Sequence, residues 1–459
     1  MKILFINPPN VPITSKNISI EPIDVLTIAS FTWNLWYEVD VFDMDREDIQ
    51  KDELKERLIN ISYDIVIIIH DYHIPLFQDK SYNILSEIIQ IIKNFNIKVI
   101  VGWKLVTYAP KQLLLNNIYP DVVISKEMEL PIRELLKNTN WNKSFLLSIP
   151  NIIFRFWDSI IETEKIESNF NINALPIPNR DLVNIDNYID VRTILSSRGC
   201  SFKCSFCSVP DFWWKRRIRS PQNVVNEIKY LSEKFWARKI LFLDDNATIE
   251  NDRMREISQL LIKLKLNVSL WCLGNLLHFD ETTMKLMYEA WFRWIHYGVE
   301  SGSDTILKSI NKYIPKEKIM NIIENTRNIW FRVRTSWIMD LPWSTAESIE
   351  ETTKFIMDIQ SEEIRIHYLS LRFWSHLFHQ FKKTSDLLPD QYIHRKLLVD
   401  KSPISDKILS SIDNLTRTLE NKDYYVINNL DDNNIFNTVS KSDTKIISFC
   451  PLKYWIGWI

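Results

Sequence analysis

Glycine is scarce in this sequence, and tryptophan is abundant. Only 6 of the 459 residues are glycine, whereas average usage of about 7% would give roughly thirty. Glycine normally supplies the left-handed backbone that ends helices and forms tight turns. A chain with so little glycine must form such turns with other residues. Its 17 tryptophans are the opposite anomaly, an unusually high number.

The excess tryptophans fall where glycine is expected. One group follows amphipathic helical segments and precedes apolar strand-like runs, the position of the left-handed residue after a helix: Trp36, Trp236, Trp291 and Trp330. A second group would complete turn dipeptides as glycine: Trp103 after Gly102, Trp157 before Asp158, and Trp343 after Pro342. We hypothesise that the source organism reads UGA codons at such positions as glycine. By contrast, Trp271 and Trp294 lie inside strand-like runs, and we expect them to be core residues.

The sequence also lacks long apolar runs and an excess charge. No apolar run approaches the roughly 20 residues that span a bilayer, and prolines interrupt the short apolar start at Pro8 and Pro9, unlike a signal peptide. With 56 basic and 58 acidic residues the net charge is −2, which gives no global attraction to nucleic acid or anionic membrane. We therefore expect a cytoplasmic protein with neither a membrane nor a nucleic acid as partner.

The cysteines are too few and too unevenly placed for a disulfide framework. There are five, an odd number, and three of them lie within the eight residues from Cys200 to Cys207. Such a cluster is typical of a metal site in a reducing compartment.

The first part of the chain alternates strand-like and helical segments, which predicts a doubly wound parallel sheet over residues 1–137. Residues 138–190 read as a connector, with a hairpin over Asn151–Glu164 that turns at Trp157-Asp158. The five predicted strands are Lys2–Ile6, Glu38–Phe42, Asp64–Ile69, Ile97–Val101 and Asp121–Ile124.

Six further strand–helix repeats fill residues 191–380 and predict a partial (β/α)6 barrel, with functional loops at the carboxyl ends of its strands. Residues 381–459 form a small extension that we expect to be mostly helical, with a helix over Ser405–Glu420. The overall fold class is therefore α/β. The six predicted barrel strands are Arg192–Ser196, Arg238–Leu243, Val268–Cys272, Arg293–Tyr297, Val333–Met339 and Ile364–Leu371.

Cys200, Cys204 and Cys207 form the pattern C-x3-C-x2-C just after the first predicted barrel strand. This tight spacing lets one loop hold a cuboidal 4Fe–4S cluster by three thiolates, which leaves the fourth iron open. A structural zinc site would need four ligands, usually in two spaced pairs. Neither Cys272 nor Cys450 has a neighbouring cysteine, so we interpret the three cysteines as cluster ligands.

The stretch Ser197–Cys207, including the aromatic Phe206 before the third cysteine, resembles the radical SAM signature. Leu241–Asn246 resembles the end of the second barrel strand of that family, and Tyr297–Gly302 resembles the region after the fourth. Two later turns depart from the family pattern: Leu341-Pro342-Trp343 has tryptophan in place of glycine, and Phe373-Trp374-Ser375 differs throughout from Pro-Gly-Thr.

The resemblance implies that S-adenosylmethionine binds the open iron and is cleaved to a 5′-deoxyadenosyl radical. It also implies a protein reductant such as flavodoxin or ferredoxin. Asp244 and Asp245 form a carboxylate pair that could serve as an acid/base site, although we rather expect it to cap the next helix or to touch the cofactor. The contacts to the cofactor that the resemblance implies, besides the cysteines, are Phe206, Asp245, Asn246, Gly298, Glu300 and Ser301.

Residues 1–137 resemble the cobalamin-binding domain of one radical SAM class through Asn7-Pro8-Pro9, Trp36–Val39 and Gly102-Trp103. The resemblance implies cobalamin contacts at Asn7, Pro8 and Gly102. The better-known cobalamin domains place a histidine ligand after the first strand, which this sequence lacks; Asp71 and His73 follow the third strand instead.

Together these features predict a methyltransferase that acts on an unactivated carbon or phosphorus centre of a small molecule or peptide. A cyclase or rearrangement enzyme without cobalamin and a non-catalytic electron-transfer module remain as alternatives. Methylthiolation is disfavoured because no cysteine precedes Cys200. Arg332 and Arg334 alternate with apolar residues and share one strand face, which points either into the barrel toward an anionic group or to the surface.

Overall fold

The chain forms two compact units. Unit 1 comprises Met1–Ile189, Asp211–Trp214 and Arg372–Trp374, and unit 2 comprises the remaining segments. None of the described helices is long and apolar enough to cross a membrane. The computed structural model describes residues 1–9, 20–45, 51–71, 78–108, 110–367, 369, 372 and 374–384, and within 410–450 residues 410–411, 414–415, 417–418, 424–427 and 445–450.

Unit 1 is built on a seven-stranded sheet in the order β2-β1-β3-β4-β5-β6-β7. The first five strands are parallel, and β6 and β7 add an antiparallel hairpin to β5. The predicted strands and the predicted hairpin are confirmed. The strands are β1 (Lys2–Asn7), β2 (Glu38–Asp43), β3 (Ile65–Ile69), β4 (Lys98–Gly102), β5 (Val122–Ile124), β6 (Ile152–Phe156) and β7 (Ser159–Glu162).

Short isoleucine- and valine-rich runs make these strands, because branched side chains suit a sheet that is buried on both faces. All five residues of β3 are buried, and the helices of unit 1 pack around them. The order 2-1-3-4-5 places a topological switch point between β1 and β3, where doubly wound sheets bind their ligands. The helices are α1 (Ile23–Trp33), α2 (Lys51–Asn60), α3 (Gln78–Lys93), α4 (Lys104–Tyr108), α5 (Glu129–Leu136) and α6 (Lys143–Leu147), with short 3₁₀ turns at Gln112–Leu115, Ile172–Ala174, Arg180–Leu182 and Ile185–Asn187.

Unit 2 contains an eight-stranded parallel sheet in the order β16-β17-β15-β14-β13-β12-β11-β8. The six predicted barrel strands are present, and the short pair β9 (Ser197–Arg198) and β10 (Arg217–Ile218) lies beside them. The strands are β8 (Arg192–Ile194), β11 (Lys239–Phe242), β12 (Ser269–Gly274), β13 (Phe292–Glu300), β14 (Arg332–Ile338), β15 (Glu363–His367), β16 (Tyr424–Ile427) and β17 (Lys445–Cys450).

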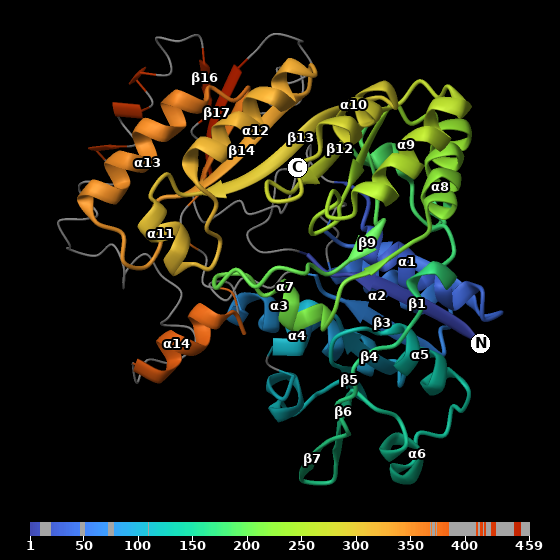
Figure 1. Cartoon of the computed structure of the whole chain (residues 1–459). Helices are drawn as coiled ribbons and strands as arrows, with labels where there is room; N and C mark the ends of the chain where they lie inside the picture. Colours follow the sequence, from blue (N-terminus) through green and yellow to red (C-terminus); the bar gives the residue numbers. More distant parts are fainter. Residues whose placement is uncertain are drawn as a thin grey trace. The chain divides into compact units, whose positions relative to one another are not determined.

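The long helices between successive strands cover one face of this sheet (Figure 1). Tyr297 of β13 bonds to Thr326 of the helix before β14, and Trp337 of β14 stacks edge-on against Phe355 of the helix after it. The opposite face of the strands therefore points away from the helices, into the barrel. The helices are α7 (Val209–Trp213, which lies mostly in unit 1), α8 (Pro221–Lys234), α9 (Asn251–Leu264), α10 (Glu281–Glu289), α11 (Asp304–Ser309), α12 (Lys316–Asn328), α13 (Ala346–Ile359) and α14 (His376–Thr384).

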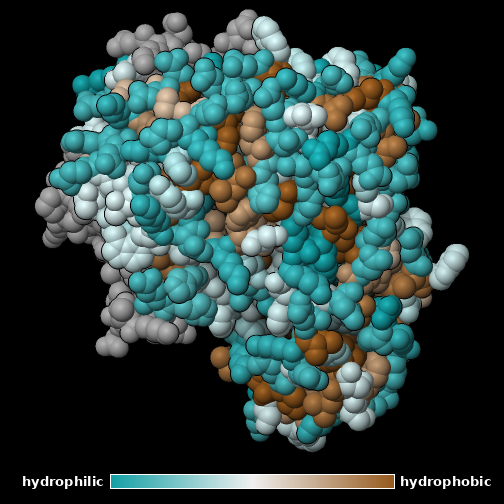
Figure 2. All heavy atoms as spheres, viewed as in Figure 1, coloured by the Kyte–Doolittle hydropathy of each residue, from teal (hydrophilic) through white to brown (hydrophobic). Residues whose placement is uncertain are grey.

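The C-terminal extension contributes strands that the sequence did not predict. In the described part of residues 381–459, β16 and β17 join the barrel sheet next to β15. The helix predicted over Ser405–Glu420 falls largely outside the described residues. The face of the molecule in Figure 2 is mainly hydrophilic with scattered hydrophobic patches, as expected when the apolar strands lie inside.

In the described part of the chain, nine tryptophans adopt the left-handed backbone region. They include every tryptophan that the sequence placed at a glycine-like position and Trp374, which stands where the family pattern has glycine, and they add Trp214. Trp271 and Trp294 have no positive φ and stack on each other between β12 and β13, as expected for core residues. The nine φ angles are 70° at Trp36, 84° at Trp103, 55° at Trp157, 61° at Trp214, 54° at Trp236, 70° at Trp291, 77° at Trp330, 68° at Trp343 and 60° at Trp374.

The end of α12 shows why glycine suits these positions. Trp330 is the left-handed residue, and the N–H of Phe331 donates to the carbonyl of Thr326, the closing bond of a glycine-type helix end. The Trp330 side chain is 78% exposed, and that of Trp36 is 96% exposed. A large apolar side chain thus gains little burial at a position where its own Cβ opposes the backbone. This supports the hypothesis that these residues are glycine in the native protein.

Replacing Trp36 and Trp330 with glycine should therefore stabilise the protein. Each substitution removes a left-handed non-glycine residue, which costs about 1–2 kcal/mol, and we expect the midpoint of denaturant unfolding to rise. Trp337→Gly is the matched control, because this indole is fully buried and its loss should cost about 3–5 kcal/mol. Peptide mass spectrometry on native protein gives the direct reading: tryptophan at both exposed positions would refute the hypothesis.

Candidate functional site

The three cysteines lie in one loop of unit 2, between β9 and α7. The loop begins at Gly199, whose φ of 85° requires glycine, and it turns so that the N–H of Cys207 donates to the carbonyl of Cys204 at 3.0 Å. The N–H of Ser205 donates to the carbonyl of Ile310 at 2.9 Å. The loop is thus fixed against the residues that follow β13 and α11.

Burial raises the pKa of all three thiols above the ordinary value. The effect is largest for Cys207, where burial raises the pKa to about 12. Without a bound cation these thiols stay protonated at neutral pH, since a thiolate in this loop would lack solvation. Iron supplies the missing positive charge, so the donor set fits a metal cluster whose binding releases protons.

The three thiols lie near one another without converging on one point. In the part of the chain that the structure describes, no three acidic, histidine or cysteine side chains are close enough to hold one metal ion. A 4Fe–4S cube takes each thiolate on a different iron, so its three ligands need not converge on one point. Electrostatic interactions nevertheless link the Cys207 thiol to those of Cys200 and Cys204.

Asp244, at the end of β11, holds the chain that leads into the cysteine loop. One of its oxygens accepts from the N–H groups of Ser196 and Ser197 at 2.6 and 3.0 Å. The other accepts from the hydroxyls of the same two serines, at 2.8 Å for Ser197. All three residues are buried, where such charge-assisted bonds are strong. These bonds make Asp244 a positioning residue for the chain that leads into the loop.

The neighbouring Asp245 acts on the loop itself, because its carboxylate accepts from the N–H of Gly199 at 2.9 Å. From the other side, Arg216 donates to the carbonyl of Gly199 at 2.9 Å. Glu250 fixes Arg216 through two bonds of 2.7 and 2.8 Å. The residue before Cys200 is therefore held from both sides.

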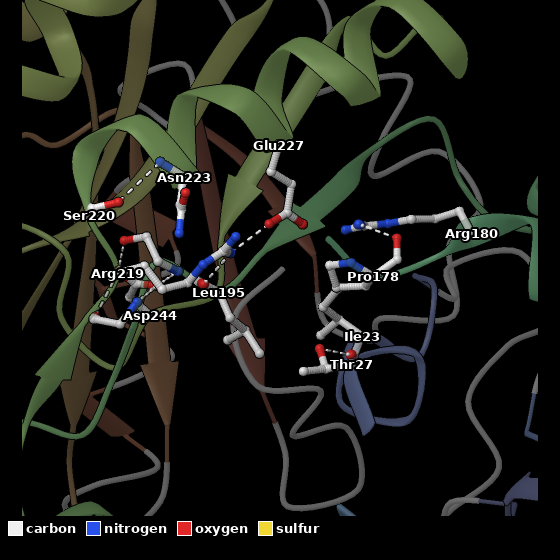
Figure 3. Close-up of polar contacts among 12 residues, drawn as sticks. Ile23, Thr27, Pro178, Arg180, Leu195, Arg219, Ser220, Asn223, Glu227 and Asp244 are labelled. Carbon is white, nitrogen blue, oxygen red and sulfur yellow. Dashed lines mark hydrogen bonds and ion pairs between the residues drawn. The ribbon is translucent and has the colours of Figure 1, made fainter. Parts of the chain in front are cut away.

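A buried ion pair supports the same strand end from below (Figure 3). Arg219 donates to the carbonyl of Leu195 at 3.0 Å and to the carboxylate of Glu227 on α8 at 2.5 Å. Arg253 of α9 adds a bond to the carbonyl of Ser196 at 2.8 Å. Two helices thus fix the carboxyl end of β8, from which the cysteine loop starts.

The end of β13 brings a charged pair toward the cysteines. The carboxylate of Glu300 lies 2.6 Å from the ammonium of Lys312. Gly298 makes room for the pair, because a Cβ there would meet the Glu300 carboxylate at 2.4 Å and the Lys312 nitrogen at 2.9 Å. Glu300 itself has a φ of 72°, and such strain in a non-glycine residue is typical of functional sites.

Lys312 was not predicted by the sequence. Burial lowers the pKa of its ammonium, but the Glu300 carboxylate and the thiols of Cys204 and Cys207 outweigh that effect and hold the pKa above its ordinary value. Its nitrogen also lies 6.0 Å from the ring centre of Phe206, within cation–π range. Lys312 therefore connects three of the predicted site residues: Glu300, Cys204 and Phe206.

Asn246 and Ser301, two of the other predicted contacts, differ in their surroundings. The side-chain oxygen of Asn246 is buried without a hydrogen-bond partner in the described structure, which fits a group that receives a ligand. The hydroxyl of Ser301 is instead engaged within the protein, with Thr352 of α13 at 3.1 Å and the N–H of Ser303 at 3.1 Å. Its role here is to shape the loop after β13.

In unit 1, the predicted cobalamin residues lie at the switch point of the sheet. Asn7 ends β1 and donates to Asp43 at the end of β2 at 2.7 Å, and Tyr188 donates to the same carboxylate at 2.6 Å. His70, directly after β3, is buried, which lowers the pKa of its imidazole to about 4. His73 lies outside the described residues.

The end of β4 is closely packed. A Cβ at Gly102 would meet the side chain of Met128 at 2.4 Å, so the glycine serves internal packing. Trp103 is fully buried, donates to Asp24 at 3.0 Å and packs edge-on against Phe212 at 5.5 Å. The indole fills the strand end beside the switch point, and the φ of 84° at residue 103 is one that suits glycine.

Asp244→Asn should weaken both the fold of unit 2 and its hold on a cluster. An amide would place donor hydrogens opposite the donors of Ser196 and Ser197, and the lost bonds should cost about 2–4 kcal/mol in the free energy of unfolding. Iron and sulfide content after anaerobic reconstitution should fall. The control Asp252→Asn, on a 96% exposed side chain of α9, should change neither quantity. Full cluster content and an unchanged unfolding midpoint in Asp244→Asn would contradict the positioning role.

Comparison with known proteins agrees with this site. Residues 194–356 match the model of the Radical SAM superfamily. Over 389 residues the chain is 26% identical to an uncharacterized methyltransferase of Pyrococcus horikoshii, covering 82% of this chain and 83% of that protein. Over 204 residues it is 26% identical to cytidylyl-2-hydroxyethylphosphonate methyltransferase of Streptomyces wedmorensis, covering 39% of this chain and 37% of that one.

Among solved structures, the chain is similar to TsrM from Kitasatospora setae, a radical S-adenosylmethionine methyltransferase with cobalamin and a 4Fe–4S cluster bound. The TM-score is 0.69 at 17% identity, over 80% of this chain and 74% of that chain. At this identity the likeness concerns the fold, and it extends over both units. Residues 194–356, which contain the cysteine loop and the strands β11 to β14, are thus similar to the Radical SAM superfamily, and both units are similar in fold to TsrM.

Proposed function

We propose that this enzyme cleaves S-adenosylmethionine reductively and methylates an unactivated carbon or phosphorus centre, with cobalamin as the methyl carrier. The observation that carries the proposal is the half-buried loop of Cys200, Cys204 and Cys207, held next to the Glu300–Lys312 pair at the carboxyl end of β13. A three-thiolate site at the open end of a barrel is the arrangement that radical chemistry on this cofactor requires.

When bound, a cluster with one open iron supplies the electron that breaks a carbon–sulfur bond of S-adenosylmethionine. The protein's own residues bind and orient. The three thiolates hold the cluster, Asp244 and Asp245 fix the loop, and the Lys312 ammonium offsets negative charge near Cys204. Asn246 and Phe206 are the residues we assign to contact with the cofactor, because both belong to the segments at this end of the barrel.

Cobalamin would lie at the switch point of the sheet in unit 1, against Asn7, Pro8 and the end of β4. Bound there, it would supply the methyl group. The strand order supports this placement, as do the fold shared with a cobalamin-containing methyltransferase and the methyltransferases among the relatives.

One observation favours a second function, radical chemistry without cobalamin. Trp103 fills the end of β4 when it is tryptophan, and cyclisation or rearrangement by the barrel alone would not need this edge. The identity of residue 103 therefore decides between the two functions.

The proposal also covers partners and location. The substrate is a small molecule or peptide, and the electron comes from a protein such as flavodoxin or ferredoxin. Buried, reduced thiols at Cys204 and Cys207 suit a reducing compartment such as the cytoplasm, and the balanced net charge of −2 gives no reason to expect nucleic acid.

The experiment is formation of 5′-deoxyadenosine from S-adenosylmethionine by reduced, anaerobically reconstituted protein. Wild type should form the nucleoside, and Cys204→Ala should reduce it to background because the cluster loses one of three ligands. Cys272→Ala is the matched control: this buried thiol lies in β12 and its loss should leave nucleoside formation near the wild-type level. Equal activity of Cys204→Ala and wild type would overturn the proposal.

A second arm adds cobalamin and compares the tryptophan-containing protein with Trp103→Gly. Cobalamin that stays with the Trp103→Gly chain through gel filtration, with raised methyl transfer, supports the methyltransferase. Nucleoside formation without cobalamin retention in either protein favours the second function. Trp36→Gly is the control for a general effect of added glycine. This residue lies between α1 and β2, far from the switch point.

A further inference from the structure

The inward face of β13, β14 and β15 carries a charged cluster that the proposed function does not use. Side chains alternate along a strand, and Tyr297 and Trp337 point to the helices. Their neighbours His296 and Ser336 therefore face into the barrel, and the 2.5 Å contact between the His296 ring nitrogen and the Ser336 hydroxyl confirms it. This settles the face of Arg334, which pairs in register with His296 and points inward.

Two guanidinium groups on this face share one carboxylate. Glu363, in register with Arg334, binds Arg334 through one oxygen at 2.7 Å and Arg365 through the other at 2.8 Å. Burial alone would raise the pKa of Glu363, but the two arginines outweigh it and lower the pKa to about 2. The carboxylate is thus ionised, and the trio keeps one positive charge that it does not balance itself.

The unbalanced charge is hard to explain as a stabilising device. Glu363 and Arg334 are 2% and 7% exposed, and a buried ion pair seldom stabilises a fold beyond an apolar replacement. The second guanidinium makes the cluster less favourable still, because Arg365 and burial together lower the pKa of Arg334 to about 10. A ligand of opposite charge would remove this cost.

The cluster also has donors to offer. The Nε of Arg334 is buried without a hydrogen-bond partner. Arg365 contacts Glu363 through its own Nε, which leaves its two terminal nitrogens without a protein partner among the described residues. A guanidinium presents such nitrogens as a fork that matches a carboxylate or phosphate.

The cluster is continuous with the cofactor end of the barrel. From Arg334 the face rises through Ser336 and Arg365 toward the carboxyl ends of the strands. His296 lies within electrostatic reach of Arg334, Arg365, His367 and also Lys312, the residue next to the cysteines. A group bound here would lie in the same barrel as the cluster loop.

We propose that the inward face of β13–β15 is an oxyanion site that takes a carboxylate, phosphate or phosphonate group of the substrate, with Arg365 as the main donor and Arg334 and Glu363 as positioning residues. The proposal rests on the proposed function, because it places the substrate in the barrel that the cofactor enters. It narrows the substrate to an anionic molecule, held by its charged end so that the carbon or phosphorus centre to be methylated is fixed.

The test titrates methylphosphonate and acetate, separately, into cluster-loaded protein containing S-adenosylmethionine, by isothermal calorimetry. At least one probe should bind to the wild type. Arg365→Gln should weaken binding about 10- to 100-fold, since a charge-assisted bond is lost, and Arg365→Lys should recover part of it. Glu363→Gln should tighten binding, because it removes the carboxylate that competes with the ligand. Arg255→Gln, on the outer helix α9, is the control and should have no effect.

The opposite signs of the two main variants separate a binding role from a structural one. Equal weakening by Arg365→Gln and Glu363→Gln, or no binding of either probe to wild type, would overturn the proposal. So would a parallel loss of S-adenosylmethionine affinity in Arg365→Gln, which would assign the site to the carboxylate of that cofactor. If Glu363→Gln fails to fold, the comparison of anion binding by Arg365→Lys and Arg365→Gln still tests the binding role of Arg365. If the protein binds the anion but forms no 5′-deoxyadenosine, the anion site is supported. In that case only the proposed function is refuted.

Discussion

The carboxylate of Asp244 is the interaction on which the site depends. The cysteine loop has no regular secondary structure of its own, and it starts at a strand end that must be fixed for the loop to be placed. Four bonds from Ser196 and Ser197 to one carboxylate tie β8 to β11 at the point where the loop begins. Without them, fewer bonds would order the loop before the cluster binds, and binding would cost more conformational entropy.

Charge is the second constraint on unit 2. The three half-buried thiols bind a cluster only as anions, and the barrel places a cation near two of them: Lys312 near Cys204 and Arg216 near Cys200. Carboxylates accompany these two cations, Glu300 beside Lys312 and Glu250 beside Arg216. Further down the inward face, Arg334 and Arg365 share the single carboxylate of Glu363, and this unbalanced charge is the basis for the oxyanion site that we propose.

The sequence predicted the strands well because they are short, branched and apolar, as in the fully buried β3. It located the cysteine loop from spacing alone. It could not find Lys312, which reaches Glu300 only because α11 turns the chain back. It also left the face of Arg334 open, since period-2 alternation gives two faces and only the contacts of Tyr297 and Trp337 tell them apart.

The tryptophans show the same division between pattern and geometry. Helix–strand junctions identified Trp36 and Trp330 from sequence, but Trp214 follows a short helix without such a pattern, and only its φ of 61° reveals it. Trp103 matters most, because there the backbone geometry of glycine and a buried cofactor edge coincide. The identity of residue 103 therefore bears both on the backbone strain at this position and on the function of unit 1.

The central claim is that three cysteines hold a cluster whose fourth iron is open to S-adenosylmethionine. Electron paramagnetic resonance of the reduced, reconstituted protein, recorded with and without S-adenosylmethionine, tests it most directly. The account predicts a 4Fe–4S signal whose g-values shift when the cofactor is added, because the cofactor becomes a ligand of the open iron. A cluster signal that stays unchanged on addition would contradict it.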